Sequence, residues 1–334
     1  TIRHTDTYTI KSNQIMASIE EQAAQAIPAE VRMISGCRDE QTSADVSNVN
    51  SFQLPDPAGR AGGACTSAML KILYADHRKP DEDMSFQNLL LTMRDVLSDG
   101  GYTQIPQLSS SRNLDIKTPF NLVPDNFSGT RRAIMIGINY VGHSPGELSG
   151  CHNDVHNMKD YIMDVHGFDE GNITLLLDDG AHTSPTRDNI LSAYEQLVKS
   201  CEPGDAIFCH YSGHGGKLRD DDGDEADGYD ETLVPLDYQS AGQIRDDDLF
   251  AKLVGAFPSG VTVTCVMDCC HSGTVLDLPY QFIADGESEE MTVPADFDFG
   301  KLMSLAQMFS NGIDAGDAMK AVQMAQEAGC CNIL

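Results

Sequence analysis

Residues 261–273 read VTVTCVMDCCHSG, an apolar run that ends in a polar turn containing Cys269 and Cys270. A second apolar run, AIFCHYSGHGG at residues 206–216, ends with His214 between two glycines. Each run has the length and composition of a buried strand, and the small residues after it predict a turn away from the core. In an open α/β sheet, functional residues gather beyond the carboxyl ends of the strands. The two runs therefore predict that a thiol and an imidazole meet at one edge of a sheet.

Cys270 and His214 are the candidates for a nucleophile and its base, because a thiol is activated when a histidine takes its proton. They lie 56 residues apart, which is close to the spacing of roughly 50 between the histidine and cysteine of caspases. Cys209 and Cys265 lie inside the apolar runs, where a cysteine is usually a small buried hydrophobe. The pattern indicates a cysteine peptidase.

Residues 148–154 read LSGCHND, a third motif that precedes the other two along the chain. In this order, over residues 131–285, the three motifs resemble those of the metacaspases, calcium-dependent members of the caspase-like clan. The resemblance implies an α/β, caspase-like fold with a central, mostly parallel sheet and helices on both faces. It identifies Cys270 as the nucleophile, and it places Cys269 where the family more commonly has serine.

Three segments of the N-terminal part, residues 34–45, 62–66 and 106–111, resemble the small region of metacaspases. In most of the family this region follows the catalytic one, so the chain resembles a rearranged, type III metacaspase. Such an order is physically permissible because domain termini tend to lie at the surface. The expected division is an N-terminal extension (1–28), a small region (29–111), a linker (112–130), a catalytic region (131–285) and an acidic, then helical tail (286–334). Fully extended, the linker would span up to about 60 Å.

The composition predicts a soluble, intracellular enzyme with a sizeable core. The chain has 334 residues, 41% of them hydrophobic, and no run approaches the roughly 18 apolar residues of a membrane span. The N-terminus lacks an apolar signal core, so we expect a cytoplasmic protein. The ten cysteines show no metal-ligand spacing, which argues against a zinc site. A formal charge of −29 disfavours nucleic acid and anionic membranes as partners.

Apolar strands alternate with amphipathic helices through the catalytic region, which is typical of a sheet covered on both faces. The strands expected there span residues 132–140, 173–178, 206–211, 232–236 and 261–267, and the helices span residues 151–166, 186–200 and 246–257. In the small region, the expected strands are residues 31–35 and 102–108, and the expected helices are residues 66–75 and 86–97. Leu302, Leu305 and Met308 give the tail a helical pattern.

Acidic residues cluster after the histidine motif. Residues 220–231 superficially resemble an EF-hand loop, but Glu225 stands where that loop needs glycine, and strands flank it instead of helices. Carboxylates from separate loops can also hold a hard cation, and the resemblance implies such a calcium site, which would order nearby loops and make activity switchable. Neighbouring carboxylates would otherwise repel one another. The matching positions are Asp230, Asp246, Asp247 and Asp277, where the assignment of Asp246 and Asp247 could shift by one residue toward Asp248.

The substrate pocket implied by the resemblance consists of Cys151, Asp154, Ser212 and Asp268. Two buried carboxylates favour a cationic partner, and Arg or Lys supplies charged, directed donors. We therefore expect cleavage of protein or peptide substrates after Arg or Lys, whereas caspases use Arg-lined pockets to select an acidic residue. The backbone N–H groups of Gly215 and Cys270 would stabilise the oxyanion of the tetrahedral intermediate.

Cys209 and Cys265 each lie five residues before a catalytic candidate. If their strands are neighbours that end level, the two thiols are cross-strand partners at a separation that allows a disulfide. Such a disulfide would make activity respond to oxidation. An intracellular location favours two reduced thiols instead.

Two alternative functions fit parts of this pattern. A non-catalytic, calcium-binding pseudo-peptidase would use the acidic loops for regulation, but it would have no need of both Cys270 and His214. An Asp-specific, caspase-like protease would need cations where Asp154 and Asp268 stand. We expect a monomeric enzyme, and the resemblance implies a part in programmed cell death.

Overall fold

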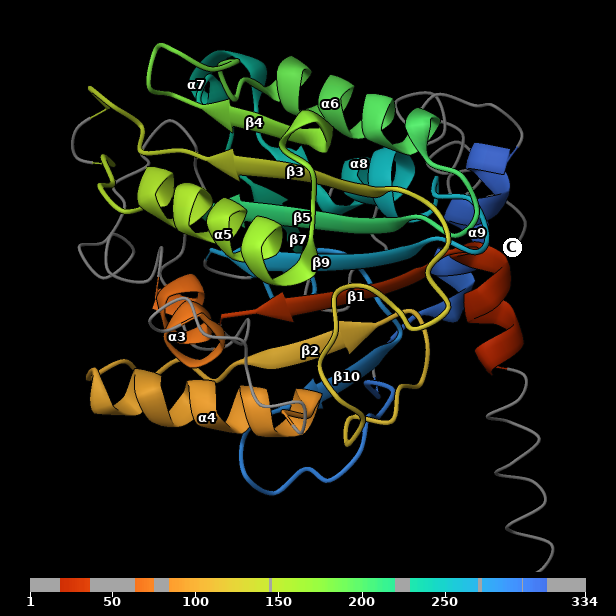
Figure 1. Ribbon diagram of the computed structural model, residues 1–334. Coiled ribbons are helices and arrows are strands. Elements are labelled where there is room, and N and C mark those ends of the chain that lie inside the picture. The colour runs from red at the N-terminus through yellow and green to blue at the C-terminus, as the bar shows by residue number, and fades with distance from the viewer. Residues whose placement is uncertain are drawn as a thin grey trace, which may run out of the picture.

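Seven strands form the central sheet, in the order β10-β2-β1-β9-β5-β3-β4 (Figure 1). The computed structural model describes residues 19–36, 64–74, 84–143, 146–219, 229–269, 272–295 and 297–310. The strands of this sheet are β1 (Glu30–Ser35), β2 (Gln107–Ser110), β3 (Arg131–Gly137), β4 (Ile173–Leu177), β5 (Ala206–Ser212), β9 (Thr262–Asp268) and β10 (Tyr280–Ile283).

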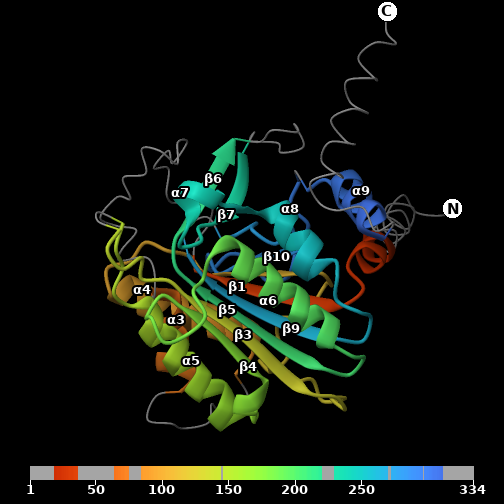
Figure 2. The ribbon, with the colours of Figure 1, turned by 90° about the horizontal axis from the view of Figure 1, so that it is seen from above.

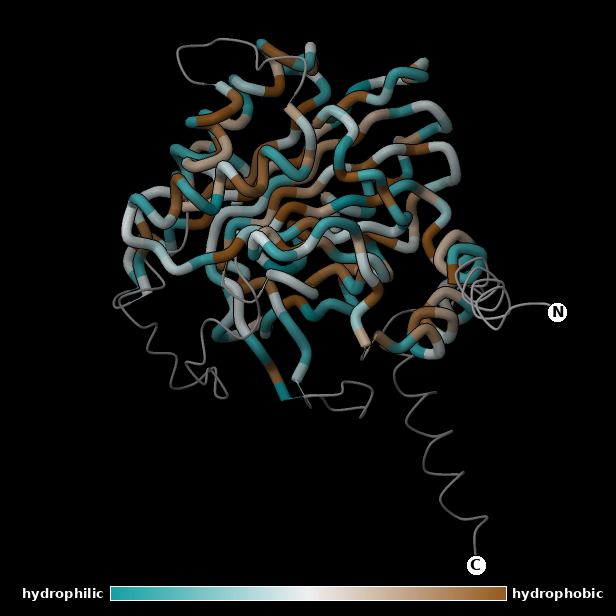
Figure 3. The backbone as a smooth tube through the Cα atoms, turned by 90° about the horizontal axis from the view of Figure 1, so that it is seen from below, coloured by the Kyte–Doolittle hydropathy of each residue, from teal (hydrophilic) through white to brown (hydrophobic). Residues whose placement is uncertain are grey.

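Five neighbouring strands, β1, β9, β5, β3 and β4, run parallel, while β2 pairs antiparallel with both β1 and β10. β5 and β9 are buried along their whole length, as expected where helices cover both faces of a parallel sheet. Hydrophobic residues recur along these central strands (Figure 3). The predicted α/β class, with a mostly parallel sheet between helices, is confirmed.

Helices cover the two faces of the sheet (Figure 2). Besides a helix at residues 19–26, the described helices, with the 3₁₀ turn η4 and the π-helical segment η5, are α3 (Ala64–Leu73), α4 (Phe86–Asp99), α5 (Cys151–His166), η4 (Glu170–Asn172), α6 (Arg187–Ser200), α7 (Tyr238–Ala241), α8 (Asp246–Leu249), η5 (Phe250–Val254) and α9 (Phe299–Ser310). The apolar sides of α3, α4 and α5 pack on one face together with Phe208 and Val266. Those of α6, η5 and α9 pack on the other, together with Cys209 and Cys265. Successive residues of β5 and β9 therefore serve different layers.

Local signals set the ends of the helices that flank the catalytic strands. Thr186 caps the start of α6, where its Oγ1 accepts the N–H of Asn189 at 3.4 Å. α5 ends at Gly167, whose φ of 67° is the left-handed conformation that glycine adopts without steric cost. The predicted bounds of α5, residues 151–166, are confirmed.

A second, three-stranded antiparallel sheet consists of β6 (Gly215–Arg219), β7 (Tyr229–Leu233) and β8 (Ile244–Arg245). β6 follows β5 after only Gly213 and His214, so this sheet starts at the carboxyl edge of the central one. β8 runs directly into α8.

Strands from both predicted regions share the central sheet. β1 of the small region pairs with β9 of the catalytic region, and β2 pairs with β10. The linker packs on the small region, because Ile116, Phe120 and Leu122 are buried beside α4. The ring of Phe120 lies edge-on to Phe86 at a centroid distance of 5.2 Å. The rearranged chain order therefore produces one continuous sheet.

Several elements differ from the expectation. The strand expected at residues 102–108 is β2, which starts and ends later, at Gln107 and Ser110, and the one expected at residues 232–236 is β7, which starts and ends earlier. The helix expected over residues 246–257 is divided into α8 and η5. Three elements were not predicted from the sequence, namely β6, β10 and a helix at residues 19–26. β6 begins with two glycines, and the other two elements are short, so none has a clear periodic pattern.

The tail helix α9 docks on the core, since Leu302 and Leu305 are buried among the residues that α6 and η5 cover. None of the helices in the described part of the chain is long and apolar enough to cross a lipid bilayer.

Candidate functional site

The polar ends of β5 and β9 lie side by side. The two strands are parallel neighbours, and their register pairs Cys209 with Cys265 and Ser212 with Asp268. Because both strands end level, the histidine motif and the cysteine motif start from the same edge of the sheet. This register places the starts of the two motifs next to each other at the carboxyl edge of the sheet.

Cys270, the predicted nucleophile, lies with His271 outside the described residues. Described residues on either side of this pair make two hydrogen bonds. Ser272 Oγ donates to the carbonyl oxygen of Cys269 at 2.9 Å, and Cys269 is buried. Ser109 of β2 donates to the carbonyl oxygen of Gly273 at 3.3 Å, so the small region contacts the end of the cysteine motif.

His214 is buried, and a backbone carbonyl fixes its ring. Its Nε2 lies 2.9 Å from the carbonyl oxygen of Gly146. A carbonyl oxygen only accepts, so Nε2 carries the proton and Nδ1 is the accepting nitrogen of the neutral ring. Burial lowers the pKa of His214 to about 4, which keeps the ring neutral near pH 7. The imidazole is thus prepared to act as a base through Nδ1.

Two tyrosines hold the backbone of His214. Tyr140 Oη accepts the His214 N–H at 3.0 Å and donates to the carbonyl oxygen of Val234 at 2.6 Å. Tyr211 Oη donates to the carbonyl oxygen of His214 at 2.8 Å. Tyr140 has a φ of 53°, a left-handed value that is uncommon outside glycine and is often found at functional sites. The sequence alone indicated neither hydroxyl, because both act on backbone groups.

The four residues of the predicted pocket, Cys151, Asp154, Ser212 and Asp268, are buried at this edge. Ser212 Oγ donates to Asp154 Oδ2 at 2.8 Å and so joins β5 to α5. Cys151, at the start of α5, also hydrogen-bonds to Ser212. Asp268 lies beside Ser212 across the two strands. The structure therefore brings all four together.

The two pocket carboxyl groups have raised pKa values. Burial raises the pKa of Asp154 to about 6, although the Ser212 hydroxyl opposes the shift. Burial and the charge of Asp154 raise the pKa of Asp268 to about 7. A cation placed between them would favour the ionised form of both. The pocket is therefore suited to a guanidinium or ammonium group.

Helix α3 of the small region holds Asp268. The N–H of Thr66 donates to Asp268 Oδ2 at 2.6 Å, and the Thr66 hydroxyl and the Cys65 N–H also hydrogen-bond to this carboxylate. His210 Nε2 lies 3.1 Å from Thr66 Oγ1 and supports it from β5. Donors at a helix N-terminus favour the carboxylate and oppose the effect of burial. Thr66 and His210 were not predicted, and the only signal for Thr66 was its place in the small-region motif.

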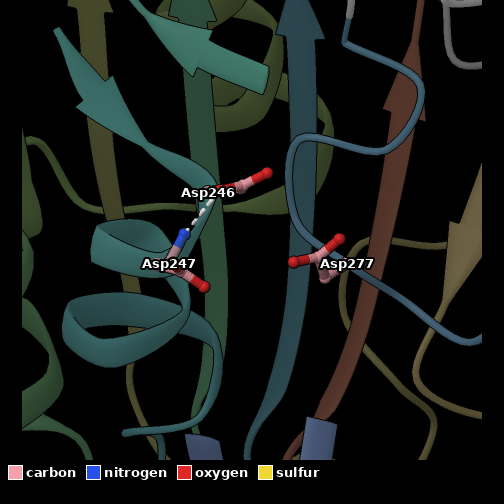
Figure 4. Close-up of side chains that lie close together, drawn as sticks. All are labelled: Asp246, Asp247 and Asp277. Carbon is pink, nitrogen blue, oxygen red and sulfur yellow. Dashed lines mark hydrogen bonds between the residues drawn. The ribbon is translucent and has the colours of Figure 1, made fainter. Parts of the chain in front are cut away.

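Three carboxylates meet where α8 begins (Figure 4). The oxygens of Asp246, Asp247 and Asp277 lie within 4.8 Å of one another, and we call these residues the acidic trio. Asp246 Oδ1 accepts the N–H of Asp247 at 2.8 Å, and both residues are buried. Burial and the charge of Asp277 raise the pKa of Asp246 well above its usual value. Carboxylate oxygens are the ligands that a hard divalent cation prefers.

Asp230, predicted as a fourth metal ligand, does not join the acidic trio. Its carboxylate lies against the guanidinium group of Arg245, which neutralises it. Asp248, the alternative to which the assignment could shift, pairs with Arg187 at 2.6 Å. Each of these two carboxylates therefore pairs with an arginine and not with the trio. The order of residues in the sequence does not show these ion pairs.

Cys209 and Cys265 are cross-strand partners, as the sequence predicted. Both thiols are free and buried. Hydrogen bonding to Cys265 and burial raise the pKa of Cys209 well above its usual value. Since the thiolate is the reactive form, this environment favours the reduced pair. The disulfide is not formed in this structure.

Comparisons with known proteins agree with this geometry. Residues 131–279 match a family model described as the metacaspase peptidase C14 domain, and residues 4–116 match a caspase domain model. "Metacaspase III c" of Phaeodactylum tricornutum is 57% identical over 291 residues, which cover 87% of this chain and 86% of that protein. "Metacaspase-1" of Mycosarcoma maydis is 46% identical over 189 residues, covering 56% of this chain and 46% of that protein. "Metacaspase-1" of Pyricularia oryzae is 41% identical over 203 residues, covering 60% and 51%, so the match spans about half the length of these two fungal relatives.

Replacing the Tyr140 hydroxyl should loosen the histidine loop. In Tyr140→Phe the buried N–H of His214 loses its acceptor, so we expect the free energy of unfolding to fall by about 1–3 kcal/mol. Urea unfolding followed by circular dichroism measures this change. Tyr102→Phe is the matched control, because Tyr102 is exposed, and its effect should stay within about 0.5 kcal/mol. Equal effects of the two substitutions would contradict the role given to Tyr140.

Proposed function

Because the chain belongs to the metacaspase family of cysteine endopeptidases, we propose that it hydrolyses peptide bonds after Arg or Lys and that calcium controls this activity. The observation that carries the specificity is the pair of buried carboxylates, Asp154 and Asp268, beside Ser212 at the carboxyl edge of the sheet. The reaction is inferred from membership of the family, and the substrate preference is inferred from the charge of the pocket.

His214 acts as the base in the proposed mechanism. Its Nε2–H is bound to Gly146, so Nδ1 takes the proton of the Cys270 thiol and later gives it to the leaving amine. The Cys270 sulfur attacks the carbonyl carbon, the C–N bond breaks, and water then hydrolyses the thioester. Gly215, the first residue of β6, and Cys270 are the proposed N–H donors to the oxyanion.

A cationic side chain suits the pocket better than an acidic one. A guanidinium or ammonium group would pair with Asp154 and Asp268, and each charge-assisted hydrogen bond contributes about 1.5–3 kcal/mol. An acidic side chain would bring a third negative charge into a buried space. The Asp-specific alternative is therefore disfavoured. The fixed ring of His214 disfavours the non-catalytic alternative, which needs no oriented base.

The acidic trio fits calcium, because it gathers three carboxylates of which two are buried. When bound, calcium would supply the positive charge that neutralises the trio. Asp277 lies seven residues after Cys270, and its N–H donates to the carbonyl oxygen of Thr274 at 2.7 Å. The trio is thus connected to the loop that follows the nucleophile. Asp246 and Asp247 connect it to the start of α8.

Other expectations from the sequence remain predictions. They are a cytoplasmic location, a monomeric state, control by oxidation at Cys209 and Cys265, and a part in programmed cell death. The charge of −29 still argues against nucleic acid and anionic membranes as partners. Protein substrates follow from membership of a peptidase family.

The nucleophile is tested by two alanine substitutions at adjacent thiols. Cys270→Ala should abolish hydrolysis of peptides with Arg or Lys before the scissile bond, because it removes the thiol that is proposed to form the thioester. Cys269→Ala, the matched control, should keep most of the activity, since Cys269 is buried in the core. Fluorogenic Arg, Lys and Asp peptides measure the rate, and thermal unfolding confirms folding. An active Cys270→Ala enzyme, or faster cleavage after Asp, would refute the proposal.

The pocket carboxylates predict a pH dependence. Only ionised carboxylates pair with a cationic substrate, so kcat/KM for an Arg peptide should rise as pH increases through about 6 to 7, the raised pKa values of Asp154 and Asp268. Thr66→Val removes a donor from Asp268 and should move this rise upward by about half a pH unit to one unit.

Thr264→Val is the control for this shift. Thr264 is also a buried threonine and lies on the same strand as Asp268, and its hydroxyl has no hydrogen-bond partner among the described residues. It should leave the profile unchanged. Superimposable profiles for the Thr66 variant and the native enzyme would show that Thr66 does not tune the pocket.

The metal part of the proposal is tested at the acidic trio. Asp246→Asn combined with Asp247→Asn should eliminate calcium binding, measured by isothermal titration calorimetry, and the calcium response of the peptidase, because it removes two ligand charges. Asp248→Asn is the matched control and should retain both, since Asp248 pairs with Arg187. Calcium binding that survives in the double variant would place the site elsewhere.

A further inference from the structure

A lysine from the tail reaches the acidic trio. The Nζ atom of Lys301 lies 3.4 Å from Asp277 Oδ2 and 3.9 Å from Asp247 Oδ1, and only 11% of its side chain is exposed. Lys301 lies in the first turn of α9, in the tail to which no function was assigned. The position that a metal cation would need is therefore next to an ammonium group of the chain itself.

The placement of Lys301 is built into the docking of α9. Leu302 and Leu305 anchor the helix in the core. Asp298 Oδ1 accepts the N–H groups of Gly300 and Lys301, at 2.6 and 3.1 Å, and caps the first turn. These contacts fix the backbone from which Lys301 extends. They leave its flexible side chain able to move without undocking the helix.

The acidic trio accounts for the position of this ammonium group better than the helix does. A cation in the first turn of a helix faces the positive end of the helix dipole, which disfavours it. A buried ammonium also requires a charged partner. The trio supplies that partner, and the charge of Lys301 in turn opposes the upward pKa shift of Asp246. Lys301 is thus held by the carboxylates.

One ammonium group balances only part of the charge of the trio. The nearby guanidinium groups are engaged elsewhere, Arg245 with Asp230 and Arg187 with Asp248. A divalent cation would neutralise more of the charge than Lys301 does. It would bind Asp277 next to an ammonium already 3.4 Å from the same carboxylate, and two cations at that range repel each other.

We propose that Lys301 is a tethered competitor for the calcium site: its ammonium group occupies the acidic trio in the metal-free enzyme, and calcium must displace it to bind. Lys301 thereby raises the calcium concentration at which the site fills. Coupling between binding events is reciprocal, so calcium also weakens the hold of the trio on Lys301 and on the first turn of α9. This inference rests on the calcium part of the proposed function.

Amine labelling of the full-length native protein tests the displacement directly. Brief acetylation, quantified by mass spectrometry, should modify Lys301 about tenfold faster in calcium than in chelator at equal ionic strength, because the ammonium group leaves its carboxylate partners. Lys159 is the internal control. It pairs with Glu170 at 2.5 Å, its side chain is 19% exposed, and its rate should not change. Unchanged or slower modification of Lys301 in calcium would overturn the inference.

Substitution tests the competition. Lys301→Gln should bind calcium about tenfold more tightly than the native protein in isothermal titration calorimetry, because the competing charge is gone. Lys301→Arg keeps the charge and should bind calcium as the native protein does. Lys159→Gln should have no effect. Equal or weaker binding by Lys301→Gln would refute the competition.

The two experiments also separate this inference from the proposed function. If the native protein binds calcium and Lys301→Gln binds it with the same affinity, only the role of Lys301 fails. If neither protein binds calcium, the calcium part of the proposed function fails and the inference fails with it. Labelling uses the native protein, so the inference stays testable even if a Lys301 variant does not fold.

Discussion

The register between β5 and β9 is the constraint on which the rest of the site depends. It sets Ser212 beside Asp268, so both strands end at one level and release their polar motifs at one edge. A shift of one residue would turn every side chain of a strand to the opposite face. A one-residue shift of β9 would turn Asp268 toward the face covered by α6. The same shift would turn Cys265 toward the face covered by α3 and α5. Because both strands are packed on both faces, burial on each side enforces the observed alignment.

Buried carboxylates occur together in the pocket and in the acidic trio, and the protein stabilises them in two ways. In the pocket, neutral donors support the carboxylates, with Ser212 bound to Asp154 and the start of α3 bound to Asp268. In the acidic trio, the ammonium group of Lys301 lies among the carboxylates. Neither arrangement offsets burial completely, since the carboxyl pKa values remain raised. In the proposed function each site takes a cation, a substrate side chain in one and a metal ion in the other.

The rearranged order of the chain does not separate its two regions in space. Thr66 reaches Asp268 across 202 positions of sequence, and Ser109 of β2 donates to the carbonyl oxygen of Gly273. The small region thus contacts the predicted pocket and the cysteine motif, although it comes first in the chain. β1 of the small region also pairs with β9 of the catalytic region, so the two regions share one sheet.

The sequence by itself predicted the α/β class and most strands and helices, because apolar periodicity is a local property. Short motifs gave His214 and Cys270 as catalytic candidates, and the family resemblance implied the pocket residues. Only the tertiary structure decided how these groups are held. The bonds from Tyr140 to the backbone of His214, from Thr66 to Asp268 and from Lys301 to the acidic trio join distant segments. It also assigned Asp230 to Arg245. Such contacts depend on strand register and helix docking, which long-range packing sets and no local pattern encodes.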